Sequence, residues 1–207
     1  MMKVLRKNEI EVNNINEIKI GDQITIQLTE YGDFTATVQT ITDRGPLFMF
    51  DQYVISRPMN LTSTNEGGFE NSDLRKWMND ELLPLFPESM QEKIKNLTIP
   101  TYGQIFGHDN LYSGVVEPDD TDRFPLMIKR KNRIADFNND NWSNFLKRFE
   151  PGWLQNRILP ELPGLIQTSF SKKGKSHFAV ITSTGEVSSL DATDAAGVRP
   201  VFIIYNL

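Results

Sequence analysis

Short runs in which apolar and polar residues alternate lie near both ends of the chain, and they constrain the fold more than any other feature of the sequence. Apolar side chains take every second position in 24–28 and again in 34–39, and residues 178–182 show a similar two-residue pattern. A period of two is typical of a strand that buries one face. The sequence therefore predicts a small antiparallel sheet in the N-terminal third and further strands near the C-terminus.

Two further runs are apolar at nearly every position. We expect residues 47–50, followed by 53–55, to form a third strand buried on both faces, and residues 201–205 to form a central strand. Turn signals separate the predicted strands: Gly21-Asp22, Tyr31-Gly32-Asp33 and Thr184-Gly185. Residues 1–56 are thus expected to be mainly β structure.

Helical periodicity appears next along the chain. Leu74, Trp77, Met78 and Leu82 share one face of a predicted helix, which Asn71 or Ser72 would cap and Pro84 would end or kink. We expect this face to pack in a core that also contains Val201, Ile203 and the N-terminal sheet. A second short helix is predicted to start at Pro87 and to bury three apolar residues: Met90, Ile94 and Leu97.

The rest of the chain is broken up by proline and glycine. Residues 98–137 are expected to be irregular, a short helix is predicted over 142–149, and prolines near 160–164 indicate another loop. Internal repeats and low-complexity linkers are absent from the sequence. We therefore predict one α+β domain over 1–207, with helices, long loops and C-terminal strands in 57–207.

Composition narrows the chemistry. The chain has no cysteine, so disulfides, thiol nucleophiles and thiolate metal sites are excluded. Its net charge of −5 argues against a nucleic-acid partner. No apolar run approaches the ~20 residues that span a bilayer, and the charged start is not followed by an apolar segment. We expect no membrane segment and a location in the host cytoplasm or a virion assembled there, and we leave the oligomeric state open.

Several motifs have both a chemical and an ordinary interpretation. Gly174-Lys175-Ser176 resembles the end of a phosphate-binding loop, but Ser169 stands where that loop needs glycine and a strand follows, so we predict a solvated turn. His108 and His177 lack the spacing of a zinc site. We therefore expect no catalytic residues, no metal site and no cofactor, with His108 either a surface residue or part of a binding loop.

Charged residues form two clusters in the irregular region. Four acidic residues form a loop without the spacing of a calcium-binding EF-hand: Glu117, Asp119, Asp120 and Asp122. They are predicted to be hydrated, and a cation site there stays the alternative. Four basic residues follow: Lys129, Arg130, Lys131 and Arg133. We expect these to pair with the acidic loop, or else to contact phosphate or an acidic partner.

Seven strings in a fixed order resemble one uncharacterised domain family of Gram-positive bacteria and their phages and prophages. They are Ile20-Gly21-Asp22, Pro58-Met59-Asn60, Ser72-Asp73-Leu74-Arg75-Lys76-Trp77-Met78-Asn79, Ile99-Pro100-Thr101-Tyr102-Gly103, Ile105-Phe106-Gly107, Gly152-Trp153-Leu154-Gln155-Asn156 and Gly197-Val198-Arg199-Pro200-Val201-Phe202. The resemblance extends from about residue 15 to residue 207. The last string is also similar to the end of the C-type-lectin-like fold, which implies that fold here. The family provides no catalytic residues to carry over, and Gln155-Asn156 departs from the Arg-Ser of many relatives.

The resemblance implies recognition. Formylglycine-generating enzymes share the lectin-like fold but need cysteine, which is absent here. We expect a non-catalytic phage- or prophage-type protein that recognises a host or phage protein or a glycan. The alternatives are a virion assembly subunit and, with less support, an enzyme built from scattered Asp, Glu and His.

The expected recognition residues lie in two loops and were chosen for aromatic area and amide groups: Tyr102, His108, Trp153, Gln155 and Asn156. Trp153 is interpreted either as the anchor of this surface or as a core residue. Arg199, beside Pro200 at the start of an apolar strand, is predicted to be structural and to donate to backbone carbonyls or a carboxylate.

Overall fold

The computed structural model describes seven stretches of the chain: 2–6, 9–12, 14, 17–108, 115–137, 150–159 and 174–205. The helix predicted over 142–149 and the loop near 160–164 lie outside the described residues.

The described strands form two sheets. The first has the order β11 (Val201–Ile203), β5 (Gly45–Phe50), β4 (Gly32–Thr42), β3 (Gln23–Leu28), β1 (Met2–Leu5), β2 (Glu9–Val12). The second has the order β6 (Ile55–Pro58), β10 (Ala195–Val198), β7 (Gly152–Arg157), β8 (His177–Ile181), β9 (Val187–Asp191). Neighbouring strands are antiparallel except β10 and β7, which are parallel. The α+β prediction is confirmed, with two sheets.

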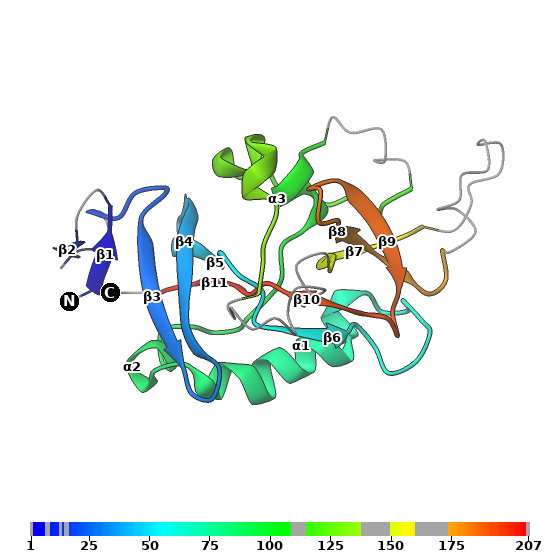
Figure 1. Cartoon of the computed structure of the whole chain (residues 1–207), viewed down its shortest axis with the longest axis horizontal. Helices are drawn as coiled ribbons and strands as arrows, with labels where there is room; N and C mark the ends of the chain where they lie inside the picture. Colours follow the sequence, from blue (N-terminus) through cyan, green and yellow to red (C-terminus); the bar gives the residue numbers. More distant parts are fainter. Residues whose placement is uncertain are drawn as a thin grey trace.

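The chain crosses between the sheets twice, and the two crossings lie side by side. It passes from β5 to β6 through residues 51–54, and from β10 to β11 through 199–200. The Val54 N–H donates to the Val198 carbonyl at 2.9 Å, and the Phe50 N–H donates to the Pro200 carbonyl at 3.0 Å. Figure 1 shows β10 and β11 following each other across the middle of the molecule. We call these two crossings the junction.

The junction explains why one predicted strand is wrong. Residues 47–55 were expected to form a single strand, but the chain leaves the first sheet after Phe50 and enters the second at Ile55. Tyr53, between them, is buried against Gly197, where an added Cβ would lie 2.5 Å from the Tyr53 ring. The close approach of this ring requires glycine at that position.

A helical segment, interrupted at Phe86 and Pro87, covers one face of both sheets (Figure 1). It follows the short 3₁₀ turn η2 (Phe69–Asn71) and comprises α1 (Asp73–Trp77), the π-helical η3 (Met78–Leu82), the 3₁₀-helical η4 (Leu83–Leu85) and, after Pro87, α2 (Glu88–Gln91). Ser72 caps α1, since its hydroxyl accepts the Arg75 N–H at 3.1 Å. The predicted cap at Ser72 is confirmed, and the segment tightens to a 3₁₀ turn at Pro84, which lacks an N–H for a longer helix.

In the core beneath this segment, the predicted helix residues are buried as expected, but the predicted residues of the last strand are not the ones that pack against them. Leu74, Trp77, Met78 and Leu82 are all buried, as predicted. Their partners from the end of the chain are Phe202 and Ile204, whereas Val201 packs in the core on the opposite face. Successive strand residues point to opposite faces, so the expected pair Val201 and Ile203 was wrong by one position.

β11 is also not central. It lies at the end of the first sheet, where Thr98 forms an isolated bridge with Val201 along its outer side. The strand is apolar on both faces because a core layer covers each of them.

The opposite face of the sheets is covered by α3 (Tyr102–Phe106), η5 (Pro125–Ile128) and η6 (Arg130–Asn132). α3 lies in a region predicted to be irregular. The sequence pattern that could have predicted this helix is a capping box at its start. Thr101 Oγ1 accepts the Gln104 N–H at 3.1 Å, and Gln104 Oε1 accepts the Thr101 N–H at 3.0 Å. Helical layers thus enclose the two sheets in a single domain. Within the described stretches, every helix is too short or too polar to cross a membrane.

Candidate functional site

Trp153, the proposed anchor of the recognition surface, is a core residue. Only 1% of it is exposed, and its indole N–H donates to the Arg57 carbonyl at 2.7 Å. Its ring meets Phe178 edge-on, with centroids 6.3 Å apart. The alternation of β7 turns this side chain toward the helical segment, so the anchor interpretation is corrected in favour of the core interpretation.

Three other residues of that surface, Tyr102, Gln155 and Asn156, are brought together, and the two side-chain amides bind within the protein. Asn156 is buried, and its Oδ1 accepts the Tyr102 N–H at 2.6 Å. Its Nδ2 donates to the Glu117 carbonyl at 2.8 Å and to Asp119 Oδ2 at 2.7 Å. Gln155 Nε2 donates to the Ile99 carbonyl at 2.5 Å. The two amides therefore join β7 to α3 and to the acidic loop.

The two amides line a pocket of about 230 Å³, which we call the loop pocket. Glu117, Asp119, Arg157 and the Gly67-Gly68 turn also line it. Glu117 forms a two-pronged ion pair with Arg157, in which Arg157 Nε lies 3.0 Å from Glu117 Oε2 and Nη2 contacts Oε1. The hydrogen bond from Arg157 lowers the pKa of Glu117.

Asp119 anchors the start of α3. Its carboxylate accepts the N–H groups of Gly103 at 2.9 Å and Thr121 at 3.1 Å. Burial raises the pKa of Asp119, but hydrogen bonds from Thr121, Gly103 and Asn156 outweigh that effect and lower it overall. A Cβ on Gly103 would collide with this carboxylate. The best-buried carboxylates of the acidic loop thus hold the fold, and the described residues contain no cluster of three metal-binding side chains.

The expected pairing of the acidic loop with the basic run is wrong. Glu117 pairs with Arg157 from β7, and Arg130 pairs with Glu186 at 2.9 Å. Gly174-Lys175-Ser176 forms a turn that leads into β8, as predicted, and the Asn65 N–H donates to the Lys175 carbonyl at 3.0 Å.

A second pocket, of about 350 Å³, lies beside the junction, and sequence reasoning missed it. Its floor is formed by side chains of β3 and β4, its side by the junction and its cover by η5, η6 and Ile134. The lining side chains are Gln23, Thr37, Gln39, Asp51, Leu126, Met127, Asn132, Ile134 and Arg199. We call it the junction pocket. The alternation in 34–39 predicted that the side chains of Thr37 and Gln39 point away from the core. It did not predict that residues 126–134 would cover them.

One carboxylate is held at the side of the junction pocket. Thr37 Oγ1 donates to Asp51 Oδ1 at 2.7 Å, and Gln23 Nε2 donates to Asp51 Oδ2 at 3.0 Å. Burial raises the pKa of Asp51, and the Thr37 hydrogen bond, the charge of Arg199 and the Gln23 hydrogen bond oppose that shift. This acid is therefore less stabilised as an anion than Asp119 in the loop pocket.

Arg199 is structural, as predicted. Its Nε donates to the Phe50 carbonyl at 2.6 Å, and its Nη1 reaches the carbonyls of Asn132 at 3.5 Å and Arg133 at 3.3 Å. It therefore ties η6 to the junction. Across the described part of the chain, no acceptor bonds its Nη2, which leaves one donor at the pocket.

Gln39 gives the junction pocket an unmatched acceptor. The residue is only 1% exposed, and its Nε2 donates to the Thr37 carbonyl at 3.1 Å. Its Oε1 is buried and has no hydrogen-bond partner among the described residues. A buried polar atom without a partner is costly, so this oxygen requires a donor from solvent or a ligand.

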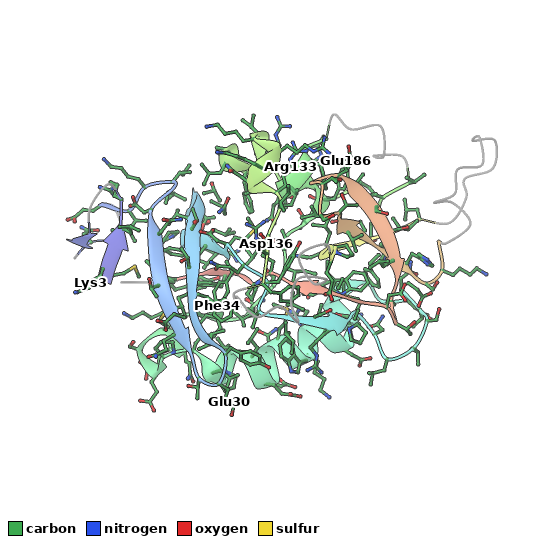
Figure 2. All side chains as sticks on the ribbon, viewed as in Figure 1. Lys3, Glu30, Phe34, Arg133, Asp136 and Glu186 are labelled. Carbon is green, nitrogen blue, oxygen red and sulfur yellow. The ribbon has the colours of Figure 1, made fainter. Side chains whose placement is uncertain are left out.

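His108, the remaining predicted site residue, is exposed just after α3 and follows Gly107, at which an added Cβ would lie 3.5 Å from the Arg123 side chain. The Arg133 guanidinium lies over the Phe106 ring, 5.1 Å from its centroid, and Arg123 Nη1 donates to the Phe106 carbonyl at 3.4 Å. Burial and then the charges of Arg123 and Arg130 lower the pKa of Arg133. Figure 2 shows Arg133 and Glu186 on the upper side of the molecule, opposite Glu30.

Neither Arg123 nor Arg133 has a carboxylate within 4.0 Å in the described structure. Ile128, 62% exposed, projects from η5 in the same segment. We call the surface formed by Arg123 and Arg133 at Phe106 the arginine face. Other exposed residues flank it in the sequence: His108, Ile128, Lys129 and Lys131.

Comparison with known proteins adds one match. No curated protein and no solved structure matches this chain. The matched segment is 44–115, which runs from β5 past α3, and it fits the expectation of an uncharacterised domain family. The family model that matches this segment is described as Domain of unknown function (DUF6273).

Proposed function

We propose that the chain is a non-catalytic recognition protein that binds an acidic segment of a partner protein through the arginine face. The observation that carries this proposal is the pair of guanidinium groups held at Phe106 by different parts of the chain. Arg123 is fixed through the Phe106 carbonyl and Arg133 through the Phe106 ring. Both arginines are thus ordered without a carboxylate partner.

Two neighbouring, positioned guanidinium groups suit carboxylates. The planar fork of arginine binds a carboxylate with two parallel hydrogen bonds, and fixing the fork beforehand reduces the entropy lost on binding. An incoming carboxylate would also relieve the repulsion between the two arginines. The chain carries a net charge of −5, so this face is a local exception to its overall acidity.

An exposed apolar side chain close in sequence to the two arginines favours a protein over a nucleic acid. Ile128 is 62% exposed next to Lys129, and protein interfaces typically surround an apolar contact with polar and arginine residues. A long polyanion would also meet the acidic remainder of the chain. A short acidic segment would avoid that repulsion.

The wider expectations from sequence belong to this proposal. The partner is a host or phage protein, the place of action is the cytoplasm, and the relatives are proteins of Gram-positive bacteria and their phages; the closing Gly197–Phe202 string supports a C-type-lectin-like fold. The alternative, a virion assembly subunit, predicts self-association, which light scattering of the purified chain would detect.

The direct test is binding of a fluorescent hexaglutamate peptide, followed by anisotropy. We expect binding at low salt that weakens as ionic strength rises, because charge attraction is screened. The double variant Arg123→Gln/Arg133→Gln should lose most of this binding. An oligonucleotide of equal charge should bind more weakly than the peptide.

A matched control has the same change of charge elsewhere. Arg44 and Lys175 are exposed and distant from the arginine face in sequence, so Arg44→Gln/Lys175→Gln tests net charge alone. Retained peptide binding in the control and loss in the arginine variant supports the proposal. Equal losses in both variants, or tighter binding of the oligonucleotide, contradicts it.

A further inference from the structure

The structure assigns a separate binding site to the junction pocket, and we infer that it holds one neutral, polyhydroxylated ring: a single saccharide unit. The starting observation is Gln39, a buried residue that lines the pocket and whose Oε1 has no partner in the described chain. The pocket of about 350 Å³ is far larger than the ~30 Å³ share of one water molecule. It also falls within the ~300–1,000 Å³ range of small-molecule sites.

The polar groups of the pocket call for a ligand that both donates and accepts. Gln39 Oε1 and the Asp51 carboxylate are acceptors, and Arg199 Nη2 is a donor. Gln23 uses its Nε2 on Thr37 and Asp51, which leaves its carbonyl oxygen as a further acceptor. Each hydroxyl has one donor and two acceptor sites, so adjacent hydroxyls on one ring match this set.

Charge decides against ionic ligands. Asp51 and Arg199 both line the pocket, and their opposite charges cancel in a site of low exposure. A cation would face the buried guanidinium, and an anion would face the carboxylate. Since unpaired charge is costly to bury, the pocket favours a neutral ligand.

The cover of the pocket suits the carbon skeleton of such a ring. Leu126, Met127 and Ile134 contribute apolar side chains opposite the polar floor of β3 and β4. A sugar ring has polar edges and apolar C–H faces, so it can present hydroxyls to Gln39 and Asp51 while its face contacts this cover. Small-ligand sites commonly combine an apolar wall with a few convergent polar groups.

The test uses three rings of the same size and different charge on the full chain. Nuclear magnetic resonance would follow the side-chain amides of Gln23 and Gln39 during titration with glucose, glucosamine and glucuronate. We expect glucose to shift both amides with a dissociation constant in the roughly millimolar range, and the cationic and anionic sugars to bind about tenfold more weakly. Galactose and N-acetylglucosamine extend the neutral set.

Two variants sharpen the result. Gln39→Met keeps the side-chain length and should weaken glucose binding about tenfold by removing the acceptor; Gln27→Met, at an exposed position of β3, should leave it unchanged. Arg123→Gln should also leave it unchanged, because Arg123 contacts the Phe106 carbonyl and does not line the pocket, and this separates the site from the arginine face. Titration of the wild-type chain decides the matter even if Gln39→Met does not fold. Absence of shifts with every neutral sugar up to about 100 mM, or equal binding of a charged ring, overturns the inference.

Discussion

The loop pocket and the junction pocket are lined by the same kinds of side chain, but they use them differently. In the loop pocket the Asn156 amide forms three hydrogen bonds within the protein, and the Asp119 carboxylate accepts several. In the junction pocket the Gln39 amide forms one, and its oxygen has no partner in the described chain. Polar residues at a concave surface are therefore not by themselves a sign of a binding site.

The difference shows what separates a structural cluster from a binding site. The loop pocket joins β7, α3 and the acidic loop, so its polar groups hold the backbone together. The junction pocket lies between a sheet and its cover, where hydrogen bonds are left incomplete on the side of Gln39 and Arg199. Substitutions that remove a group should thus affect stability in the first pocket and binding in the second.

The largest expected effect lies in the strand that carries the loop pocket. Trp153→Ala removes a side chain that is 1% exposed and should lower the free energy of unfolding by about 3–5 kcal/mol, as loss of a buried aromatic commonly does. Urea denaturation measures this change. Leu61→Ala, at a residue 79% exposed, is the control and should change stability by less than about 0.5 kcal/mol. A Trp153 variant as stable as wild type would place Trp153 back on the surface.

A smaller effect on stability is expected from the carboxylates of the two pockets, Asp119 in the loop pocket and Asp51 in the junction pocket. The pKa of Asp119 is lowered in the fold, so its anion adds stability that is present above the unfolded value near 3.8 and is lost as pH falls through the folded pKa. The pKa of Asp51 is raised, so its ionisation reduces stability as pH rises through the folded pKa. At pH 7 Asp119→Asn should therefore cost about 1–2 kcal/mol, and Asp51→Asn should cost less.

Unfolding of both variants between about pH 3 and pH 7 checks these signs, since the window includes the reference value of an aspartate. The deficit of Asp119→Asn relative to wild type should shrink toward acid pH. A deficit that stays constant over this range, or a larger one for Asp51→Asn at pH 7, would reverse the assignment of the two carboxylates.

Much of the fold could be predicted from local patterns, because those patterns act within a few residues. Alternation predicted β3 and β4, and helical spacing predicted the buried face from Leu74 to Leu82. The same reasoning was wrong in the last strand, where consecutive residues are apolar. Nothing in the sequence distinguishes Val201 from Phe202 as the residue that packs against the helical segment. The choice depends on pairing with β5, which is a long-range contact.

The candidate sites depended still more on distant contacts. The amides at Gln155 and Asn156 were correctly placed near Tyr102, but their bonding to Ile99 and Asp119 could not be derived from spacing. The junction pocket combines residues from β3, β4, the junction, η5 and η6, which only the folded chain brings together.

The central claim is that the Asn156 amide holds the fold whereas the Gln39 amide leaves an acceptor for a ligand. Unfolding free energies of two near-isosteric variants, Asn156→Leu and Gln39→Met, measured in urea without ligand, test it most directly. Asn156→Leu removes three hydrogen bonds from buried groups and should cost about 1–3 kcal/mol or more. Gln39→Met removes an unmatched acceptor and one hydrogen bond, from Nε2 to the Thr37 carbonyl, and should cost less, about 0.5–1.5 kcal/mol. Equal losses in the two variants, or a larger loss for Gln39→Met, would contradict the claim.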